Sequence, residues 1–281
     1  AMPSKPGARP NASSSPPASS SSILSTQAPF VLMISLEASG NFLNMYAHLY
    51  HALSTKRNVL SASDVESVIT GLSKPNLEGV IVTDAGLAER SASRALTKLV
   101  DYVKSGGRVV VGCNFSGFIT GPDFKKFFRA FGLDWQSGSY HRATFFKNPN
   151  NEVVAANPSL PPSYSMKALH VDGIKPEMAV YHPTHQSVTQ SRVFPPVPVT
   201  NFDEAPVVYA SVGSGYLAYI GDVNAEEDSS EVYLALLELL DEDKSKPTSP
   251  SVTATIVAPQ PAPKPVPAAA PFSSPLVLTA P

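Results

Sequence analysis

The sequence is short of cysteine, of excess charge of either sign and of long apolar runs. It has one Cys in 281 residues, 21 Lys and Arg against 23 Asp and Glu, and a pI near 6.3. A single thiol excludes an intramolecular disulfide and indicates a reducing compartment, so we expect a cytoplasmic protein. Without a basic stripe, a nucleic-acid surface is not expected. No apolar run approaches the ~20 residues of a membrane span, so we expect no membrane partner.

Both ends of the chain are rich in Ser or Pro and poor in charge. Residues 1–28 hold nine Ser and five Pro, and residues 247–281 hold ten Pro and one charged residue, Lys264. Such segments bury too little apolar surface to offset the entropy lost on ordering. We predict a disordered leader over 1–28, one domain over 29–243 and a disordered tail over 244–281, which is a candidate segment for binding partner proteins.

Strand-like and helix-like patterns alternate in the first half of this domain. Phe30–Leu36, Gly79–Thr83 and Val109–Val111 are unbroken apolar runs, typical of strands that are covered on both faces. Four β-α units in series predict an α/β fold with a parallel sheet and helices on both faces. Residues 133–206 are rich in Pro and turns, and predict an irregular insertion or cover with antiparallel strands. A hairpin is predicted over Val207–Gly221.

The helix ends carry recognisable signals. Ser63-x-x-Glu66 has the pattern of a capping box, and Gly71 is the expected stop of that helix. Pro122 is expected to open a helix of Phe residues that ends at Gly132.

The segment after Val111 has the layout of a nucleophile elbow, in which a tight strand-to-helix turn raises one side chain above the sheet. Elbows place a small residue two positions before the raised one, so counting from Gly112 predicts that Asn114 is raised. Cys113 then points away and is expected to be a buried, inert thiol, with a nucleophilic role as the alternative. An amide is not a nucleophile.

The runs LVDYVKSGGRVVVG (99–112) and GYLAYIGDVN (215–224) resemble the elbow and the closing hairpin of the class I glutamine amidotransferase-like superfamily. Within it, the chain is most similar to the trehalose-utilisation (ThuA-like) proteins. The resemblance covers roughly 30–241. It implies a flavodoxin-like three-layer fold with a mostly parallel sheet, an antiparallel extension and ligands bound above the carboxyl ends of the strands.

The chain departs from that pattern where the chemistry lies. Active amidotransferases present Cys at the elbow and a His-x-Glu pair before the last helix, and ThuA-like proteins tend to place His at the elbow. Here Asn114 holds the predicted elbow position, and residues 221–227 contain no His. Glutamine hydrolysis by the usual triad is therefore not expected. The sequence contains no Gly-x-Ser-x-Gly motif, so an esterase is not expected either.

Polar residues that follow the predicted strands form the candidate site. Each has a structural alternative: Glu37 and Asp84 as helix caps or solvated loop residues, and Asp222 and Asn224 as the ends of an Asx turn. His141 begins a strand of the insertion, from which a cover can reach the elbow. The candidate binding residues are Asp84, Asn114, Ser116, Asp222 and Asn224, and the candidate acid and base are Glu37 and His141.

Two function classes remain open. The first is a catalytically silent domain that binds a small polar molecule or acts through its surface and tails, and the missing nucleophile favours it. The second is a hydrolase-like or lyase-like enzyme that uses His141 with Glu37 or Asp222 without a covalent intermediate. His182 and His185 lack the third converging ligand of a metal site, so neither a metal nor a cofactor is expected. A homodimer remains open as a further partner.

Overall fold

A nine-stranded mixed β-sheet runs through the part of the chain that the computed structural model describes, residues 28–37 and 42–240. The strands are β1 (Phe30–Ile34), β2 (Asn58–Ala62), β3 (Leu77–Val82), β4 (Arg108–Val111), β5 (Gln136–Lys147), β6 (Ser163–Asp172), β7 (Ala179–His182), β8 (Val207–Val212) and β9 (Gly215–Ile220). They lie side by side in the order β2-β1-β3-β4-β9-β8-β7-β5-β6.

The first half of the sheet is parallel, which confirms the predicted α/β class. Strands β2, β1, β3, β4 and β9 all run in the same direction. The three apolar runs that were predicted as central strands form β1, β3 and β4, with Leu32 beside Val80 and Ile81 beside Val110. Every residue of β1 is buried, because both faces of this half of the sheet are covered.

The second half of the sheet is antiparallel. Strands β8 and β9 form the predicted hairpin, and β8, β7, β5 and β6 continue it. The strands expected near Ala143–Lys147, Ala168–Val171 and Met178–Tyr181 belong to β5, β6 and β7, of which β5 and β6 are longer than predicted.

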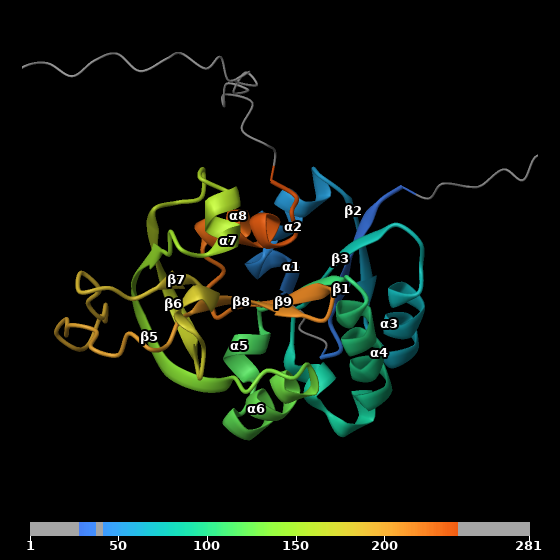
Figure 1. Cartoon of the computed structure of the whole chain (residues 1–281), viewed down its shortest axis with the longest axis horizontal. Helices are drawn as coiled ribbons and strands as arrows, with labels where there is room; N and C mark the ends of the chain where they lie inside the picture. The colour runs from blue at the N-terminus through green and yellow to red at the C-terminus, as the bar shows by residue number, and fades with distance from the viewer. Residues whose placement is uncertain (1–27, 38–41, 241–281) are drawn as a thin grey trace, which may run out of the picture. The chain divides into compact units, whose positions relative to one another are not determined.

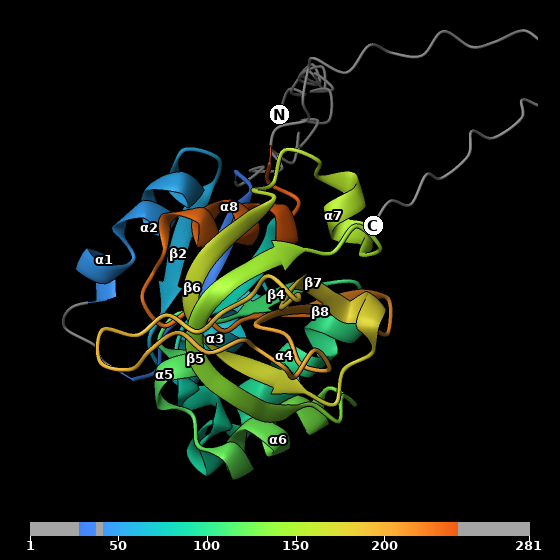
Figure 2. The same cartoon turned by 90° about the vertical axis from the view of Figure 1, so that its left-hand side faces the viewer.

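Strands β5 and β6 form a long curved hairpin (Figure 2). This hairpin also pairs with the segment that follows β9. The Leu169 N–H donates to the Gly221 carbonyl, and the Val223 N–H donates to the Lys167 carbonyl. The stretch 133–206 is therefore an antiparallel extension that reaches the carboxyl end of β9, as the sequence predicts.

Helices cover both faces of the sheet. They are α1 (Phe42–Met45), α2 (Ala47–Ser54), α3 (Val65–Leu72), α4 (Ser93–Lys104), α5 (Phe115–Phe118), α6 (Gly121–Ala130), α7 (Glu152–Ala156) and α8 (Glu227–Leu236), with 3-10 turns η1 (Ala85–Ala88), η2 (Arg90–Ala92) and η3 (Pro176–Met178). Helices α2 and α8 lie together on one face and share a core with Val31 and Met33. Helices α3, α4 and α6 contribute to the core that contains Leu32 and Ile34. Figure 1 shows α2 and α8 on the side of β8 and β9 opposite α6.

An aromatic cluster holds α5 and α6 to the sheet. The Phe128 ring lies 4.6 Å from Phe124, 5.1 Å from Trp135 and 5.8 Å from Tyr219, measured between ring centroids. Phe128 is fully buried. Helix α6 begins where the sequence predicts, with Pro122 in its first turn and Thr120 as the cap.

Two predicted helix signals were wrong. The capping box of α3 is formed by Asp64 and Ser67, and not by Ser63 and Glu66, because the Asp64 carboxylate accepts from the Ser67 N–H. Gly71 lies inside α3 and does not end it. A Cβ there would lie 2.8 Å from Leu32 Cδ2, so close packing of helix against strand accounts for this glycine.

The predicted leader and tail lie outside the described residues, except for Ala28. No helix among residues 28–37 and 42–240 has the length and apolar character to cross a membrane.

The aromatic cluster gives a test of the fold. Phe128→Ala should lower the free energy of unfolding by about 3–5 kcal/mol, because it leaves a cavity among five aromatic rings. Phe118→Ala is the matched control, since this ring is 71% exposed and its loss should cost within about 0.5 kcal/mol. Denaturant titration measures both. Equal effects of the two substitutions would contradict the packing of α6.

Candidate functional site

The sharp turn predicted after β4 is present, but its strained residue is Cys113. Cys113 has a φ of 55°, in the left-handed region that residues with a side chain rarely adopt. Asn114 has a φ of −66° and simply precedes α5. The prediction that Asn114 is the raised residue was therefore wrong by one position, and the elbow residue is Cys113.

The role of Gly112 explains why the predicted elbow position was wrong. A Cβ at Gly112 would lie 2.1 Å from the Tyr233 hydroxyl and 2.9 Å from the Ile220 carbonyl oxygen. Gly112 is thus needed for the close approach of a tyrosine from α8, and it does not mark a position two residues before the raised side chain.

That tyrosine covers the thiol. The Cys113 N–H donates to the Tyr233 hydroxyl at 2.8 Å, and the Cys113 Sγ lies 3.4 Å from the same oxygen. The Cys113 side chain is fully buried, as the sequence predicts.

The electrostatics of the elbow keep the thiol protonated. Burial raises the pKa of Cys113 to about 12, against a lowering effect of the Tyr233 hydroxyl. The carboxylates of Asp222 and Asp84 also raise this pKa, since a thiolate beside them would be repelled. Thiolate is the nucleophilic form, and the raised pKa disfavours it at neutral pH.

Asp222 follows β9, and both of its carboxylate oxygens accept hydrogen bonds from the loop after β9 and from the first turn of α8. Its Oδ1 accepts from the Asn224 N–H, and its Oδ2 accepts from the Glu226 N–H and the Ser229 hydroxyl at 2.7 Å each. Burial raises the pKa of Asp222, while these hydrogen bonds oppose the rise. The Asx-turn alternative therefore describes Asp222 and Asn224, and the Asn224 side chain is exposed.

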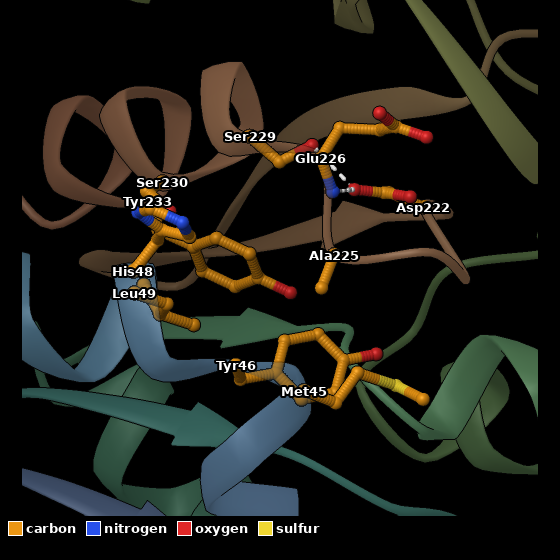
Figure 3. A pocket seen from close by; sticks show the side chains of 10 residues that line it. All are labelled: Met45, Tyr46, His48, Leu49, Asp222, Ala225, Glu226, Ser229, Ser230 and Tyr233. Carbon is orange, nitrogen blue, oxygen red and sulfur yellow. Dashed lines mark hydrogen bonds between the residues drawn. The ribbon is translucent and has the colours of Figure 1, made fainter.

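The space between this loop and α2 is nearly filled. Figure 3 shows Tyr46 and Tyr233 facing the Asp222 loop across a small cavity. Its volume is about 10 Å³, the limit for one water molecule. The Tyr46 hydroxyl is buried without a hydrogen-bond partner among the described residues. The cavity is lined by Met45, Tyr46, His48, Leu49, Asp222, Ala225, Glu226, Ser229, Ser230 and Tyr233.

Asp84 and Glu37 lie together at the carboxyl ends of β3 and β1. The Asp84 carboxylate accepts from the Ser35 hydroxyl, the Glu37 N–H and the Gly86 N–H at 2.9–3.1 Å, so it caps η1. The Glu37 side chain is exposed. Partial burial raises the pKa of Glu37, and the carboxylates of Asp84 and Glu89 add to the rise.

The other two candidate residues at the elbow are Ser116 and Asn114. The Ser116 hydroxyl is buried and donates to the Ile220 carbonyl at 3.0 Å, which ties α5 to β9. Asn114 is half-buried, and its side chain makes no capping hydrogen bond to α5.

His141 is half-buried and lies in a second cluster, with the buried residues His170 and Glu204. The two imidazole centroids are 4.5 Å apart, and the His170 Nδ1 lies 3.1 Å from the Glu204 carboxylate. Glu204 also accepts from the Ser139 N–H at 2.9 Å. Among the described residues, neither the His141 Nε2 nor the His170 Nε2 has a hydrogen-bond partner. The expected pairing of His141 with Glu37 or Asp222 is replaced by these neighbours.

The surroundings of this cluster lower the pKa of both His141 and Glu204. Burial lowers the pKa of His141, and the His170 ring acts in the same direction, while Glu204 opposes it. Burial would raise the pKa of Glu204, but the hydrogen bonds from His170 and Ser139 lower it to about 2.

The β5–β6 hairpin connects the His141 cluster to the loop that carries Asp222. Ala168 of β6 forms an antiparallel bridge with Asp222, and Ala168 also pairs with His141 of β5. An ion pair between Arg142 and Glu226 clamps the same hairpin to the loop after β9. The cover therefore reaches the elbow region, as the position of His141 predicts.

Among residues 28–37 and 42–240, no group of three or more His, Cys, Asp and Glu side chains could hold a metal ion. His185 instead contacts the Phe202 ring at 4.7 Å.

Four residues that lie around Cys113 and His141 could not be recognised from the sequence as parts of these sites. Tyr46 and Tyr233 lie in apolar helical patterns, where a buried tyrosine looks like any other core residue. Glu204 lies in the Pro-rich stretch, and His170 in a strand pattern. Only tertiary contacts bring them to Cys113 and His141.

No protein-family model and no curated protein matches the chain. Solved structures do. One, a ThuA-like protein from Parabacteroides merdae, is 13% identical over 77% of this chain and 92% of its own, with a TM-score of 0.47. Another, a ThuA-like protein from Bacteroides uniformis, is 12% identical over 75% of this chain and 89% of its own, with a TM-score of 0.44.

The β-galactosidase of Bacillus circulans sp. alkalophilus is also similar, with 12% identity over 74% of this chain, 30% of its own and a TM-score of 0.43. The chain is thus similar to ThuA-like structures, the proteins its sequence resembles. Identities of this size say nothing about which chemistry the chain performs.

Cys113 should react slowly with iodoacetamide at pH 7.5 in the folded protein, because its thiol is buried and protonated. The same thiol should react at the rate of a free cysteine in 6 M guanidinium, which serves as the internal control. Mass spectrometry of the modified fraction over time measures both. Rapid stoichiometric modification of the folded chain would contradict the burial.

The free energy of unfolding should fall as the pH falls below about 6.5. The folded-state pKa of His141 lies below its unfolded value of 6.5, so the unfolded chain binds more protons there. Glu204 stays charged over this range, since its folded pKa is about 2. Its stabilising contribution is present above its unfolded pKa near 4.5 and is lost only towards pH 2.

Denaturant titrations between pH 7.5 and 5 measure this slope. His141→Leu should make it shallower, whereas His51→Leu, on an exposed part of α2, should leave it unchanged. An unchanged slope in His141→Leu would mean that His141 titrates alike in the folded and unfolded chains.

Proposed function

We propose that residues 29–243 are a catalytically silent, glutamine amidotransferase-like domain that acts by binding a partner. The observation that carries this proposal is the elbow residue Cys113, which is buried, protonated and covered by Tyr233.

The strand order supports a flavodoxin-like architecture. The parallel strands β2-β1-β3-β4-β9 have the order 2-1-3-4-5 of that fold, and helices pack on both faces to give three layers. Open sheets of this order bind ligands at the carboxyl ends of their strands. Asp84, Cys113 and Asp222 follow β3, β4 and β9 at this edge.

The elbow has the backbone of a catalytic site without its chemistry. A cysteine nucleophile needs a lowered pKa or an adjacent base. The groups that act on Cys113 are a tyrosine hydroxyl and the carboxylates of Asp222 and Asp84, and burial keeps the thiol neutral. A substrate also needs room, and the cavity beside Tyr233 holds about 10 Å³.

A closed elbow favours a macromolecular partner over a small polar molecule bound above it. Large apolar side chains are instead exposed on the loop between β7 and β8, where Phe194 is 72% exposed. Exposed apolar groups that gather in one segment are typical of interaction sites.

The enzymatic alternative receives less support. A general base must reach the proton that it removes. His141 has its Nε2 buried beside His170, and Asp222 already accepts three hydrogen bonds. Glu37 is exposed and makes its described contact to Asp84 through its backbone N–H.

The full chain should show no turnover of glutamine or of a panel of ester, amide and glycoside substrates. Cys113→Ala and His141→Leu should behave like the wild type, with thermal unfolding as the check that each variant is folded. Ammonia release and chromogenic product formation measure turnover. Activity lost in Cys113→Ala would establish thiol catalysis, and activity lost only in His141→Leu would establish the non-covalent enzyme. Either result would overturn the silent role.

A further inference from the structure

The loop between β7 and β8 carries an exposed proline-rich segment, Arg192–Pro198, with the sequence RVFPPVP. All seven residues are exposed. Val193 is 80% exposed, Phe194 72% and Val197 57%. The loop, coloured yellow to orange, projects from the sheet at the left of Figure 1. Three large apolar side chains in one short exposed segment have no role in the core.

Proline chemistry restricts the backbone in the second half of this segment, whereas Arg192–Phe194 form a bend next to Ser191. Pro195, Pro196 and Pro198 each fix φ near −65°. Phe194 and Val197 each precede a proline, which disfavours the helical region and favours polyproline II. Pro195–Pro198 therefore give up little conformational entropy on binding as a polyproline II helix, and the bend at Arg192–Phe194 opens to extend that helix to Arg192.

The spacing places the chemistry on defined edges of such a helix. Polyproline II has three residues per turn, so Arg192, Pro195 and Pro198 fall on one edge. Phe194 and Val197 fall on a second edge, beside the prolines that follow them. Val193 and Pro196 occupy the third edge. Two edges can contact a groove while the third faces solvent.

The base of the loop is fastened to the sheet. The Gln190 N–H donates to the Arg142 carbonyl of β5 at 2.8 Å, and the Ser187 hydroxyl donates to the Thr144 carbonyl. Thr189 closes the loop, since its N–H donates to the Val197 carbonyl at 2.8 Å.

The tip is held from within. The Ser191 hydroxyl accepts from the N–H groups of Val193 and Phe194 at 3.1 Å. The loop therefore presents the segment in an ordered way.

Arg192 is available for a partner. Within residues 28–37 and 42–240, no carboxylate forms an ion pair with this guanidinium, and the side chain is exposed. A planar guanidinium without an ion pair in the described part of the chain suits a carboxylate on the surface of a partner.

We propose that Arg192–Pro198 is a docking segment for an SH3-type domain. Such domains bind Pro-x-x-Pro ligands in a groove lined by aromatic side chains. The dipeptides Phe194-Pro195 and Val197-Pro198 fill two successive pockets of the groove, and Arg192 pairs with an acidic group at its end. This partner class rests on the proposed interaction role and gives it a chemistry. None of these residues lines the cavity beside Cys113.

The observations favour this partner over a second copy of the chain or a lipid surface. Either of those would take up Phe194 and Val193 without requiring proline at positions 195 and 198. Neither requires Arg192 to lie three residues before the first of these prolines.

The test uses the full chain against an array of purified SH3 domains, with dissociation constants measured by biolayer interferometry. Arg192→Glu, and separately the double change Pro195→Ala with Pro198→Ala, should weaken binding by about tenfold or more. Val193→Ser is the matched control, because it removes an exposed apolar side chain from the solvent edge, and should leave binding unchanged. Unaltered thermal unfolding verifies that each variant keeps its fold.

Other outcomes would overturn the proposal. Binding that survives the loop variants and is lost when 244–281 is removed would place the site in the Pro-rich tail. Self-association or binding to phosphatidylcholine vesicles that Phe194→Ser abolishes and Arg192→Glu leaves intact would assign the loop to a second copy or a membrane. Absence of binding to every SH3 domain, with no turnover, would defeat the partner class alone. Turnover by the wild type would defeat the silent role.

Discussion

The contact between the Tyr233 hydroxyl and the elbow is the interaction on which the edge of the parallel sheet depends. The hydroxyl accepts the Cys113 N–H and leaves no room for a Cβ at Gly112. Helix α8 brings Tyr233 there because its apolar side chains pack on the same face of the sheet as Val110 and Ile81. The packing of one helix therefore buries a strained cysteine and raises the pKa of its thiol.

The polar groups along the same edge serve the backbone. Asp84 caps η1, and Asp222 accepts hydrogen bonds from its own loop, while the β5–β6 hairpin bridges to Asp222 through Ala168. An edge where open α/β sheets bind ligands is thus occupied by internal hydrogen bonds and by a cover. The exposed apolar chemistry lies instead on the loop that carries Phe194, which is why binding at the surface is the function that we propose.

Much of the fold could be predicted because its signals are local. Unbroken apolar runs marked β1, β3 and β4, and Pro122 marked the start of α6. Two of the errors concern glycines, which a fold can require for more than one physical reason. Gly71 was taken for a helix stop but serves helix-strand packing, and Gly112 was taken for the small residue of an elbow motif but accommodates Tyr233. Of the candidate residues, Asp84 and Asp222 act electrostatically on Cys113 at the elbow, whereas His141 has His170 and Glu204 as neighbours.

The sequence by itself determined the α/β class, the insertion after the fourth β-α unit and the Pro-x-x-Pro spacing of Arg192–Pro198, because periodicity and proline act within a few residues. Only the tertiary structure decided which residue is strained at the elbow, that Tyr46 and Tyr233 close the space above it, and that His141 lies against His170. These contacts join residues more than 25 positions apart. Burial and the resulting pKa values belong to the packed core, and no local pattern encodes them.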